Sequence, residues 1–244
     1  MSETVCTGCG GVIDFSGIEP FTVCECSECG TELVIPLELE YLKLERSLGR
    51  KLFFDVYQGF DKSNNINSIV YVMDGSDREA KDFLALAKEE ASSLSTLKHV
   101  NICPMVNSGE VAGKFFVSEP LMDGSSLTDF LPDEGEMLEI DKVVDVIHSA
   151  LIGLAVAHHK EFPHHNICPE NMHIDARGNV RVKNFFISRF VAGYESSKGL
   201  KKSLVSPYYI SPERAEHGTE DKRGDVFSLG VLVFFMLTGK YPFQ

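Results

Sequence analysis

The residues in this sequence best suited to chemistry are four cysteines near its N-terminus, arranged as two pairs. Each pair has the form C-x-x-C-G, and 16 residues separate the second cysteine of one pair from the first of the other. Thiolate pairs at this spacing are typical of a tetrahedral zinc site, and the glycine after each pair lets the chain turn so that backbone amides face the sulfur atoms. The sequence therefore predicts a structural zinc ion bound by Cys6, Cys9, Cys26 and Cys29.

The alternative for these cysteines is a pair of redox-active or merely structural C-x-x-C sequences. A thioredoxin-like motif needs a βαβ context, which the pattern around both pairs lacks. Residues 1–35 contain few large apolar side chains, so a bound metal would supply much of the folding free energy. We therefore expect residues 1–36 to form a small zinc ribbon, in which Cys24 is a spare ligand that could replace Cys26.

The N-terminal segment is also strongly acidic. Residues 1–40 contain eight aspartates and glutamates and no lysine or arginine, in a chain of 244 residues whose 36 acidic and 23 basic residues give a net charge of −13. Such a segment repels the phosphates of nucleic acids. We therefore expect the ribbon to be a folding cap or a protein-docking module. Its charge argues against the alternative of a nucleic-acid-binding or metal-responsive module.

The composition, with 43% hydrophobic and 24% charged residues, indicates a globular chain of one large domain or two small ones. The longest apolar run, Val226–Leu237, has 12 residues and includes Ser228 and Gly230, whereas a membrane-spanning helix needs about 20. The first residues lack the basic and apolar regions of a secretory signal. We therefore expect no membrane segment and a cytoplasmic protein.

Periodicity predicts strands first and helices afterwards, which indicates an α+β fold with two lobes. Alternating apolar residues between 41 and 75 predict strands, and apolar residues at helical spacing predict a helix over 78–99. Glu90 lies on the apolar stripe of that helix, so its carboxylate needs a cation or hydrogen-bond donors. Two further helices are expected over 141–159 and 225–237.

A run in the second half of the chain is more specific. Residues 164–171, His-His-Asn-Ile-Cys-Pro-Glu-Asn, resemble the H-R-D-L-K-P-E-N catalytic loop of protein kinases position by position. Other kinase motifs have counterparts in the same order: a glycine-rich loop over 48–57, a C-helix glutamate at Glu90, the D-F-G position at 184–186, the A-P-E position at 211–213 and the start of the F helix at Asp225. The chain is thus similar to serine/threonine protein kinases over most of its length.

The resemblance implies a protein kinase-like domain over residues 37–244, after the zinc ribbon over 1–36. Its β-rich N-lobe is expected over about 37–120 and its helical C-lobe over about 121–244. The family continues with further helices beyond the F helix, so the C-lobe is expected to lack its C-terminal helices. Asp225 is expected to accept backbone donors from the catalytic loop, and the segment containing Ser196, Ser197 and Ser203 is expected to be an exposed loop.

Several positions that carry catalysis in the family hold other residues in this sequence. Asn166 stands in place of the aspartate that accepts the substrate's proton, and Asn184 in place of the D-F-G aspartate that holds magnesium. Cys168 replaces the lysine that neutralises the transferred phosphoryl group, and the residue is either a small cleft side chain or an activated thiol. Among the metal-holding positions, only Asn171 keeps the family's residue.

The nucleotide side departs from the family in the same way. Residues 66–74 contain no lysine, and the position of the family's phosphate-binding lysine falls on Tyr71 or Val72. Glu90 thereby loses its usual partner, for which Lys51 of the glycine-rich loop is a candidate substitute. The resemblance places a nucleotide cleft at Gly49, Lys51, Val56 and Glu90, and the replacements put the binding of ATP and magnesium in doubt.

These replacements imply a pseudokinase, a catalytically impaired kinase domain that acts as a scaffold or regulator. Its expected partner is a protein, such as an active kinase or the rest of a longer chain, and neither nucleic acid nor a membrane is expected to bind. One alternative is a divergent serine/threonine kinase that binds ATP and transfers phosphate weakly or unusually. The other alternative places the function in the zinc ribbon.

Overall fold

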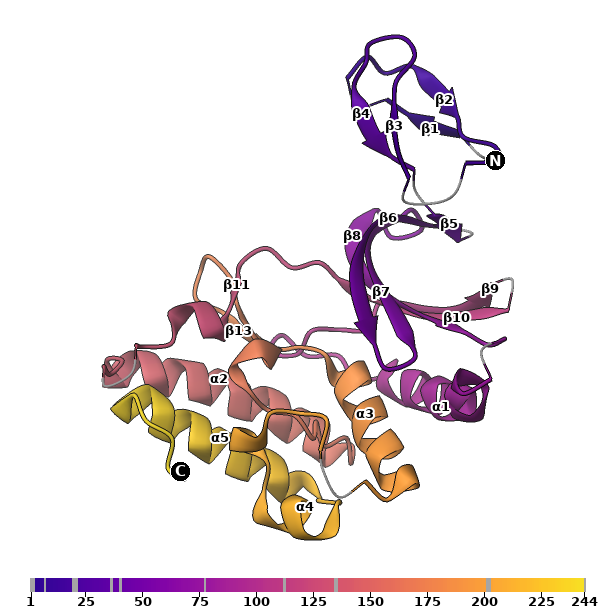
Figure 1. The fold of residues 1–244 in the computed structure, drawn as a ribbon. Helices are drawn as coiled ribbons and strands as arrows, with labels where there is room; N and C mark the ends of the chain where they lie inside the picture. Colours follow the sequence, from indigo (N-terminus) through magenta and orange to yellow (C-terminus); the bar gives the residue numbers. More distant parts are fainter. Residues whose placement is uncertain are drawn as a thin grey trace. The chain divides into compact units, whose positions relative to one another are not determined.

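The protein, described here by a computed structural model, divides into two compact units (Figure 1). Unit 1 comprises residues 1–84 and 106–121, and unit 2 comprises residues 85–105 and 122–244. This grouping differs from the lobes expected over 37–120 and 121–244 because the segment 85–105 belongs to unit 2. The structure describes residues 3–6, 8–18, 22–35, 37–39, 41–76, 78–111, 113–133, 136–200 and 203–243.

Two small hairpins begin the chain. Strand β1 (Glu3–Val5) pairs with β2 (Val12–Asp14), and β3 (Val23–Glu25) pairs with β4 (Glu32–Val34), both antiparallel. Each hairpin turns through one C-x-x-C-G sequence, and the glycine that follows each cysteine pair has positive φ, 75° at Gly10 and 72° at Gly30. A side chain would be strained in this conformation. The two turns therefore require the glycines that the sequence provides.

A six-stranded antiparallel sheet forms the rest of unit 1, in the order β5-β6-β7-β8-β10-β9. Its buried core includes Leu42, Leu44, Val70, Val72 and Phe116, which alternate along their strands and meet on one face. This alternation is the pattern that predicts strands between 41 and 75. The strands are β5 (Leu37–Leu39), β6 (Leu42–Lys51), β7 (Phe54–Asp61), β8 (Ile66–Asp74), β9 (Asn107–Val111) and β10 (Lys114–Pro120).

Unit 2 is mainly helical. Helix α2 (Ile140–His159) forms where a helix is expected over 141–159 and packs against β13 and α5. Its buried side chains, among them Val143, Ala150 and Leu154, follow helical spacing. The other elements are helices α1 (Leu84–Leu94), α3 (Phe185–Lys198), α4 (Pro212–His217) and α5 (Lys222–Thr238), and a small sheet of β11 (Ser125–Ser126), β12 (Met172–Ile174) and β13 (Val180–Val182).

Two expectations about the helices are wrong in part. The helix expected over 78–99 is shorter, because a 3-10 turn at Ala80–Phe83 precedes α1 and α1 ends at Leu94. The segment expected to be an exposed loop is helical as far as Lys198. Phe185, Phe186 and Phe190 are buried along α3 and hold the helix against the rest of unit 2. Ser196 and Ser197 therefore lie on a helix, and Ser203 follows it.

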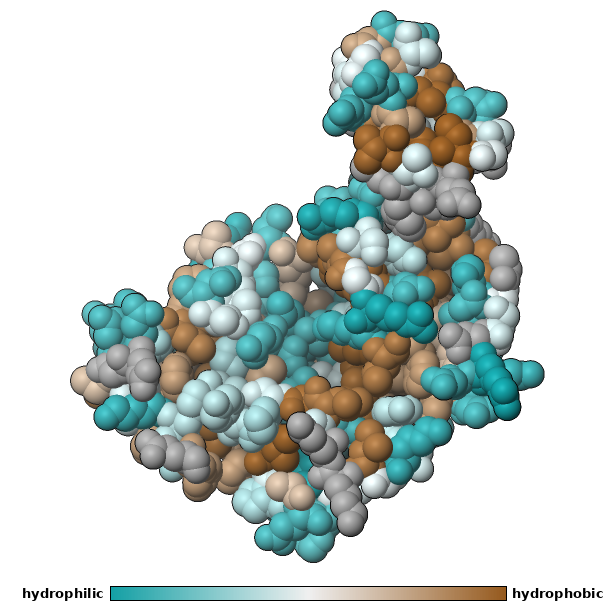
Figure 2. Space-filling model, in the orientation of Figure 1, coloured by the Kyte–Doolittle hydropathy of each residue, from teal (hydrophilic) through white to brown (hydrophobic). Residues whose placement is uncertain are grey.

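Helix α5 is strongly apolar, as expected for residues 225–237. It buries Leu229, Leu232 and Met236, whereas Val226 and Phe234 remain exposed. Figure 2 shows hydrophobic surface scattered among hydrophilic surface on the visible face of the molecule. Across the part of the chain that the structure describes, no helix has both the length and the apolar character that crossing a membrane requires.

Candidate functional site

The four predicted zinc ligands meet in the hairpin pair of unit 1. The sulfur atoms of Cys6, Cys9, Cys26 and Cys29 all lie within 4.8 Å of one another, with Cys6 Sγ 3.6 Å from Cys29 Sγ and Cys9 Sγ 3.8 Å from Cys26 Sγ. Four thiolates around one zinc ion at about 2.3 Å would be separated by about 3.8 Å. Disulfides need about 2.05 Å. The residues therefore fit a zinc ion of the zinc-ribbon type.

The backbone around each thiolate pair is built in the same way. Gly10 N donates to Cys6 O at 2.9 Å, and Gly30 N donates to Cys26 O at 2.8 Å. Hydrogen bonds from the Thr31 side chain and amide lower the pKa of the Cys29 thiol to about 6. Although the Gly11 amide lowers it, interaction with the Cys29 side chain raises the pKa of the Cys9 thiol to about 12, so without a metal the cluster favours the thiolate at Cys29 and the thiol at Cys9. Cys24 lies outside the cluster on β3, so the structure selects Cys26 rather than Cys24 as the fourth ligand.

In unit 2, the residues of the expected catalytic loop are organised around Asp225. Its Oδ2 lies 2.7 Å from both His158 Nε2 and the amide nitrogen of His164, and its Oδ1 lies 2.8 Å from the amide nitrogen of His165. Burial would raise the pKa of Asp225, but the hydrogen bonds from His158 and His164 lower it below its usual value. The prediction that Asp225 accepts backbone donors from this loop is confirmed.

His164 is fully buried beneath the same loop. Its Nε2 donates to the Lys183 carbonyl at 2.9 Å, and its Nδ1 accepts the amide proton of Asn166 at 3.2 Å, so the imidazole is neutral with its proton on Nε2. Burial lowers the pKa of His164 to about 4. The ring also contacts Phe185 edge-on, with centroids 4.5 Å apart. His164 therefore links the loop to the segment that precedes α3.

Three asparagines form a chain of amides where the family places its metal and its base. Asn184 Nδ2 donates to Asn171 Oδ1 at 2.8 Å, and Asn171 Nδ2 donates to the Asn166 carbonyl at 2.7 Å. The oxygen of Asn171 that could bind a metal thus already accepts a hydrogen bond. Asn184 adopts a left-handed conformation, with φ 65°, at the start of α3, a conformation that asparagine tolerates better than most residues.

Cys168 is buried in the same loop. Burial, together with the negative charge of Glu170, raises the pKa of the Cys168 thiol to about 12. The thiol is therefore protonated at neutral pH, whereas a nucleophilic cysteine needs a lowered pKa. Of the two interpretations of Cys168, the geometry favours the small cleft side chain.

The carboxylate of Glu90 has a cationic partner, but it is not the one considered from the sequence. Arg189 of α3 binds both oxygens, with Nε 2.6 Å from Oε2 and an Nη atom 3.2 Å from Oε1. The guanidinium also donates to the Pro163 carbonyl at 3.0 Å and lies over the Phe162 ring. Arg189, and not the candidate Lys51, is therefore the partner of Glu90, because it binds both carboxylate oxygens.

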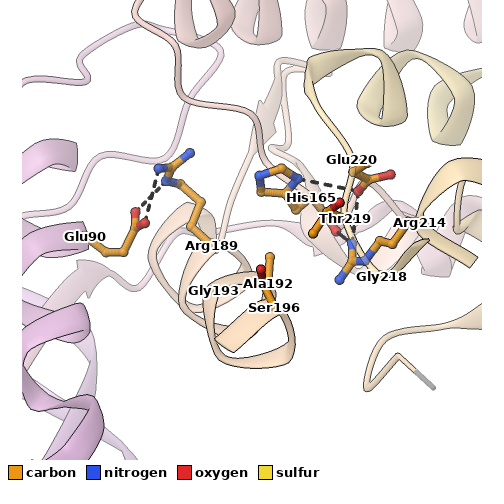
Figure 3. Close-up of a pocket in the computed structure, with 10 residues that line it drawn as sticks. All are labelled: Glu90, His165, Arg189, Ala192, Gly193, Ser196, Arg214, Gly218, Thr219 and Glu220. Atoms are coloured by element: carbon orange, nitrogen blue, oxygen red, sulfur yellow. Dashed lines mark hydrogen bonds and ion pairs between the residues drawn. The ribbon is translucent and has the colours of Figure 1, made fainter. Parts of the chain in front are cut away.

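Arg214 forms a second ion-pair cluster, which Figure 3 shows beside the first. Its guanidinium is buried, lies 2.7 Å from Glu195 Oε2 and 3.0 Å from Glu220 Oε1, and donates to the His165 carbonyl. Both clusters line a pocket of about 200 Å³. Near the start of α3, Arg189 thus binds Glu90 of α1. Near its end, Glu195 binds Arg214, which also donates to the carbonyl of His165 in the loop over 164–171.

Of the four residues expected to contact a nucleotide, Gly49, Lys51 and Val56 lie on strands β6 and β7 of unit 1, and Glu90 lies on α1 in unit 2. Gly49 pairs with Val56 and Lys51 pairs with Phe54, so the glycine-rich loop is a closed hairpin. Val56 pairs with Tyr71 and therefore shares its face, whereas Val72 lies in the core on the opposite face. Tyr71 is thus the better match for the lysine position. Its ring meets the buried Phe54 edge-on, with centroids 6.3 Å apart.

Sequence reasoning missed Arg189, Glu195 and Arg214. A helix over this segment could have been predicted, because the four-residue spacing of Phe186 and Phe190 places both on one side of a helix. The same helix would have fixed the direction in which Arg189 points. The resemblance obscured this signal by predicting a loop. No local pattern marks Arg214, whose partners lie on separate elements.

The first prediction concerns pH. His164 should bind a proton below about pH 6.5 in the unfolded chain but only below about pH 4 in the folded chain. Between these values the unfolded state binds more protons, so the free energy of unfolding should fall as the pH falls, by up to about 3 kcal/mol. Chemical denaturation at pH 4.5, 5.5 and 6.5 measures this. His164→Gln should flatten the dependence, and the exposed control His217→Gln should retain it; equal slopes would contradict the assignment.

The second prediction concerns the Glu90–Arg189 pair. Arg189→Met leaves a largely buried carboxylate without its cation and should lower the free energy of unfolding by about 2–3 kcal/mol. The double variant Glu90→Gln, Arg189→Met should lose less than the sum of the single variants, by at least about 1 kcal/mol. Urea denaturation measures both. Arg177→Met, at an exposed position, is the matched control, and strictly additive losses would mean that the pair does not stabilise unit 2.

Comparison with known proteins shows the family and the fold of the chain. The family model described as the protein kinase domain matches residues 42–244. The serine/threonine-protein kinase PknL of Mycobacterium tuberculosis is 33% identical over 189 residues, which cover 77% of this chain and 47% of PknL. PrkC of Bacillus subtilis is 29% identical over 163 residues, which cover 67% of this chain and 25% of PrkC. The chain thus spans between a quarter and half of these relatives.

The fold is similar to a solved structure as well. A crystal structure of the Mycobacterium tuberculosis PknI kinase domain, a double mutant, matches with a TM-score of 0.65 at 18% identity, and the match covers 85% of this chain and 78% of that one. The expected α+β kinase fold, with a β-rich N-terminal part and a helical C-terminal part, is confirmed. From residue 42 onward, the chain belongs to the protein kinase domain family.

Proposed function

We propose that this kinase domain is catalytically impaired and that the protein acts by binding other proteins, as a scaffold or regulator. The observation that supports this most directly is that Asn184 donates to the Asn171 side chain and Asn171 donates to the backbone carbonyl of Asn166, so that three asparagines lie together where the family has its metal ligands and its base. A general base at position 166 is typically worth 10²- to 10⁴-fold in rate. The amide of Asn166 cannot accept a proton usefully at neutral pH. The amides also lack the negative charge with which aspartate holds magnesium.

The nucleotide side supports the same proposal. Phe54, Val56, Tyr71 and Met73 lie on one face of the sheet and are buried. In the family this face holds the phosphate-binding lysine, and in this chain neither Tyr71 nor Val72 carries a charge. Gly49 and Lys51 are exposed on β6, whereas Val56, which pairs with Gly49, is buried. We therefore propose that ATP and magnesium bind weakly or not at all.

A divergent serine/threonine kinase is the second candidate. The names of the relatives favour it, since PknL and PrkC are both called serine/threonine-protein kinases. In this case Asn171 would hold magnesium after releasing Asn184, and transfer would proceed without a carboxylate at position 166. Protein substrates would then replace protein partners, so the two candidates differ in a measurable way.

The third part of the proposal concerns the N-terminal segment. We propose a zinc ribbon over residues 1–36, with one structural zinc ion on Cys6, Cys9, Cys26 and Cys29, and a kinase domain over residues 37–244. The sulfur spacing supports this assignment. A reducing compartment such as the cytoplasm would keep these thiols available for a metal. The acidic surface of the ribbon favours a protein partner over nucleic acid.

The nucleotide prediction tests the central proposal. With 1 mM ATP and 10 mM magnesium, the melting temperature of the zinc-loaded chain should change by less than about 1 °C, because a ligand stabilises only in proportion to its binding to the folded state. An active serine/threonine kinase under the same conditions is the positive control. A magnesium-dependent rise of several degrees that disappears in Asn184→Ala would favour the divergent kinase instead.

The zinc prediction tests the ribbon. Metal analysis and native mass spectrometry should find one zinc per chain, which chelation removes. Cys26→Ser should abolish stoichiometric binding, and Cys24→Ser, two residues away on the same segment, should leave it intact. Equal loss in both variants, or no zinc in the parent chain, would overturn the assignment of the four ligands.

A further inference from the structure

Both hairpins of the ribbon place like charges directly opposite each other. Glu3 pairs with Asp14 across β1 and β2, and Glu25 pairs with Glu32 across β3 and β4. All four side chains are exposed. Opposed like charges destabilise an antiparallel pair, and the same unfavourable arrangement occurs in both hairpins. A local conflict of this kind is expected where a surface serves a function other than folding.

Exposed valines lie beside these acids. Val5 and Val12 are directly opposite each other and are 60% and 65% exposed. Each is two residues from an acid of the opposed pair, so Glu3, Val5, Val12 and Asp14 share one face of the hairpin. We call these four residues the valine–acid face. Figure 2 shows hydrophobic surface among hydrophilic surface where Figure 1 draws β1 to β4.

The ribbon has no cation of its own to offset this charge, since residues 1–40 contain no lysine or arginine. Asp14 accepts hydrogen bonds from Ser16 at 2.8 and 2.6 Å, which lower its pKa and keep it ionised. A zinc ion on four thiolates would leave a formal charge of −2 on the cluster. Zinc loading therefore does not reverse the sign of the surface, and a cationic partner fits it.

The hairpin also offers open edges. Among the residues that the structure describes, β1 and β2 pair only with each other, so the outer backbone groups of each strand can pair with an added strand. In an added extended segment, side chains at every second position would lie on the valine–acid face. At the β1 edge a lysine or arginine would then lie beside Glu3 and an apolar side chain beside Val5; at the β2 edge the same side chains would lie beside Asp14 and Val12.

We propose that the valine–acid face binds an extended segment of a partner protein in which basic and apolar residues alternate at every second position. The inference rests on the proposed role in protein binding and names the chemical class of the partner. It does not depend on whether the kinase domain is active. The charge and the exposed valines of the valine–acid face act together, so neither a purely basic nor a purely apolar segment would bind as tightly.

The test uses the zinc-loaded full chain and a fluorescein-labelled peptide with capped termini. In this peptide lysine and valine alternate at every second position, with threonine between them. Fluorescence anisotropy measures the dissociation constant. Replacing the peptide valines by serine, or its lysines by glutamate, should weaken binding by about tenfold or more. The protein variant Val5→Ser, Val12→Ser should weaken binding by a similar factor. Glu3→Gln, Asp14→Asn should weaken it and reduce its dependence on salt.

The control is Val100→Ser, which changes a valine that is 74% exposed in unit 2 and should leave binding unchanged. Each ribbon variant must still bind one zinc per chain, which separates lost docking from lost folding. The inference would be overturned if the parent peptide did not bind at millimolar concentration. It would also be overturned if the peptide with serine in place of valine, and the Val5→Ser, Val12→Ser protein, bound as tightly as their parents do. Phosphotransfer activity would contradict the proposed function alone, and the docking result would stand.

Discussion

The carboxylate of Asp225 is the interaction on which the organisation of unit 2 depends. It is almost fully buried at the start of α5, and its two oxygens bind the amides of His164 and His165 and the ring of His158. Without it, the loop would leave two backbone donors unsatisfied inside the protein, each costing about 1–3 kcal/mol. Asp225 therefore joins α2 and α5 to the loop that carries Asn166, Cys168 and Asn171.

This arrangement separates the scaffold of a kinase domain from its chemistry. Asp225 and His164, which satisfy buried backbone groups, are the residues that the family resemblance implies. Amides and a thiol stand at the positions where the resemblance implies contacts to phosphate and metal. Asn184 and Asn171 hydrogen-bond to each other, so the neutral site is satisfied and needs no ligand to balance it. The amides of Asn184 and Asn171 carry no charge that would need a cation, and they hydrogen-bond within the described part of the chain.

Much of the fold could be predicted from the sequence. Alternating apolar residues predict strands β6 to β8, the order of the motifs indicates the family, and the cysteine spacing predicts that four sulfur atoms lie together. The site could be predicted only where local rules apply. Glu90 clearly needed a cation, but Arg189 is 99 residues away on a segment that the resemblance presents as a loop. The choice between Tyr71 and Val72 also needed the strand register, because adjacent residues on a strand face opposite sides. Long-range pairing and register are the information that one sequence does not contain.

The two units have a consequence for how the chain can fold. Unit 1 is interrupted by residues 85–105, which belong to unit 2, and resumes at 106. Strands β9 and β10 are therefore made after α1, and β10 must insert between β8 and β9 to complete the sheet. The partner that neutralises Glu90 is synthesised later still. During synthesis, neither unit can be finished before the other has begun, so folding must proceed through contacts that are distant in sequence, which form slowly. The chain crosses between its units three times, and no single cut releases either of them whole.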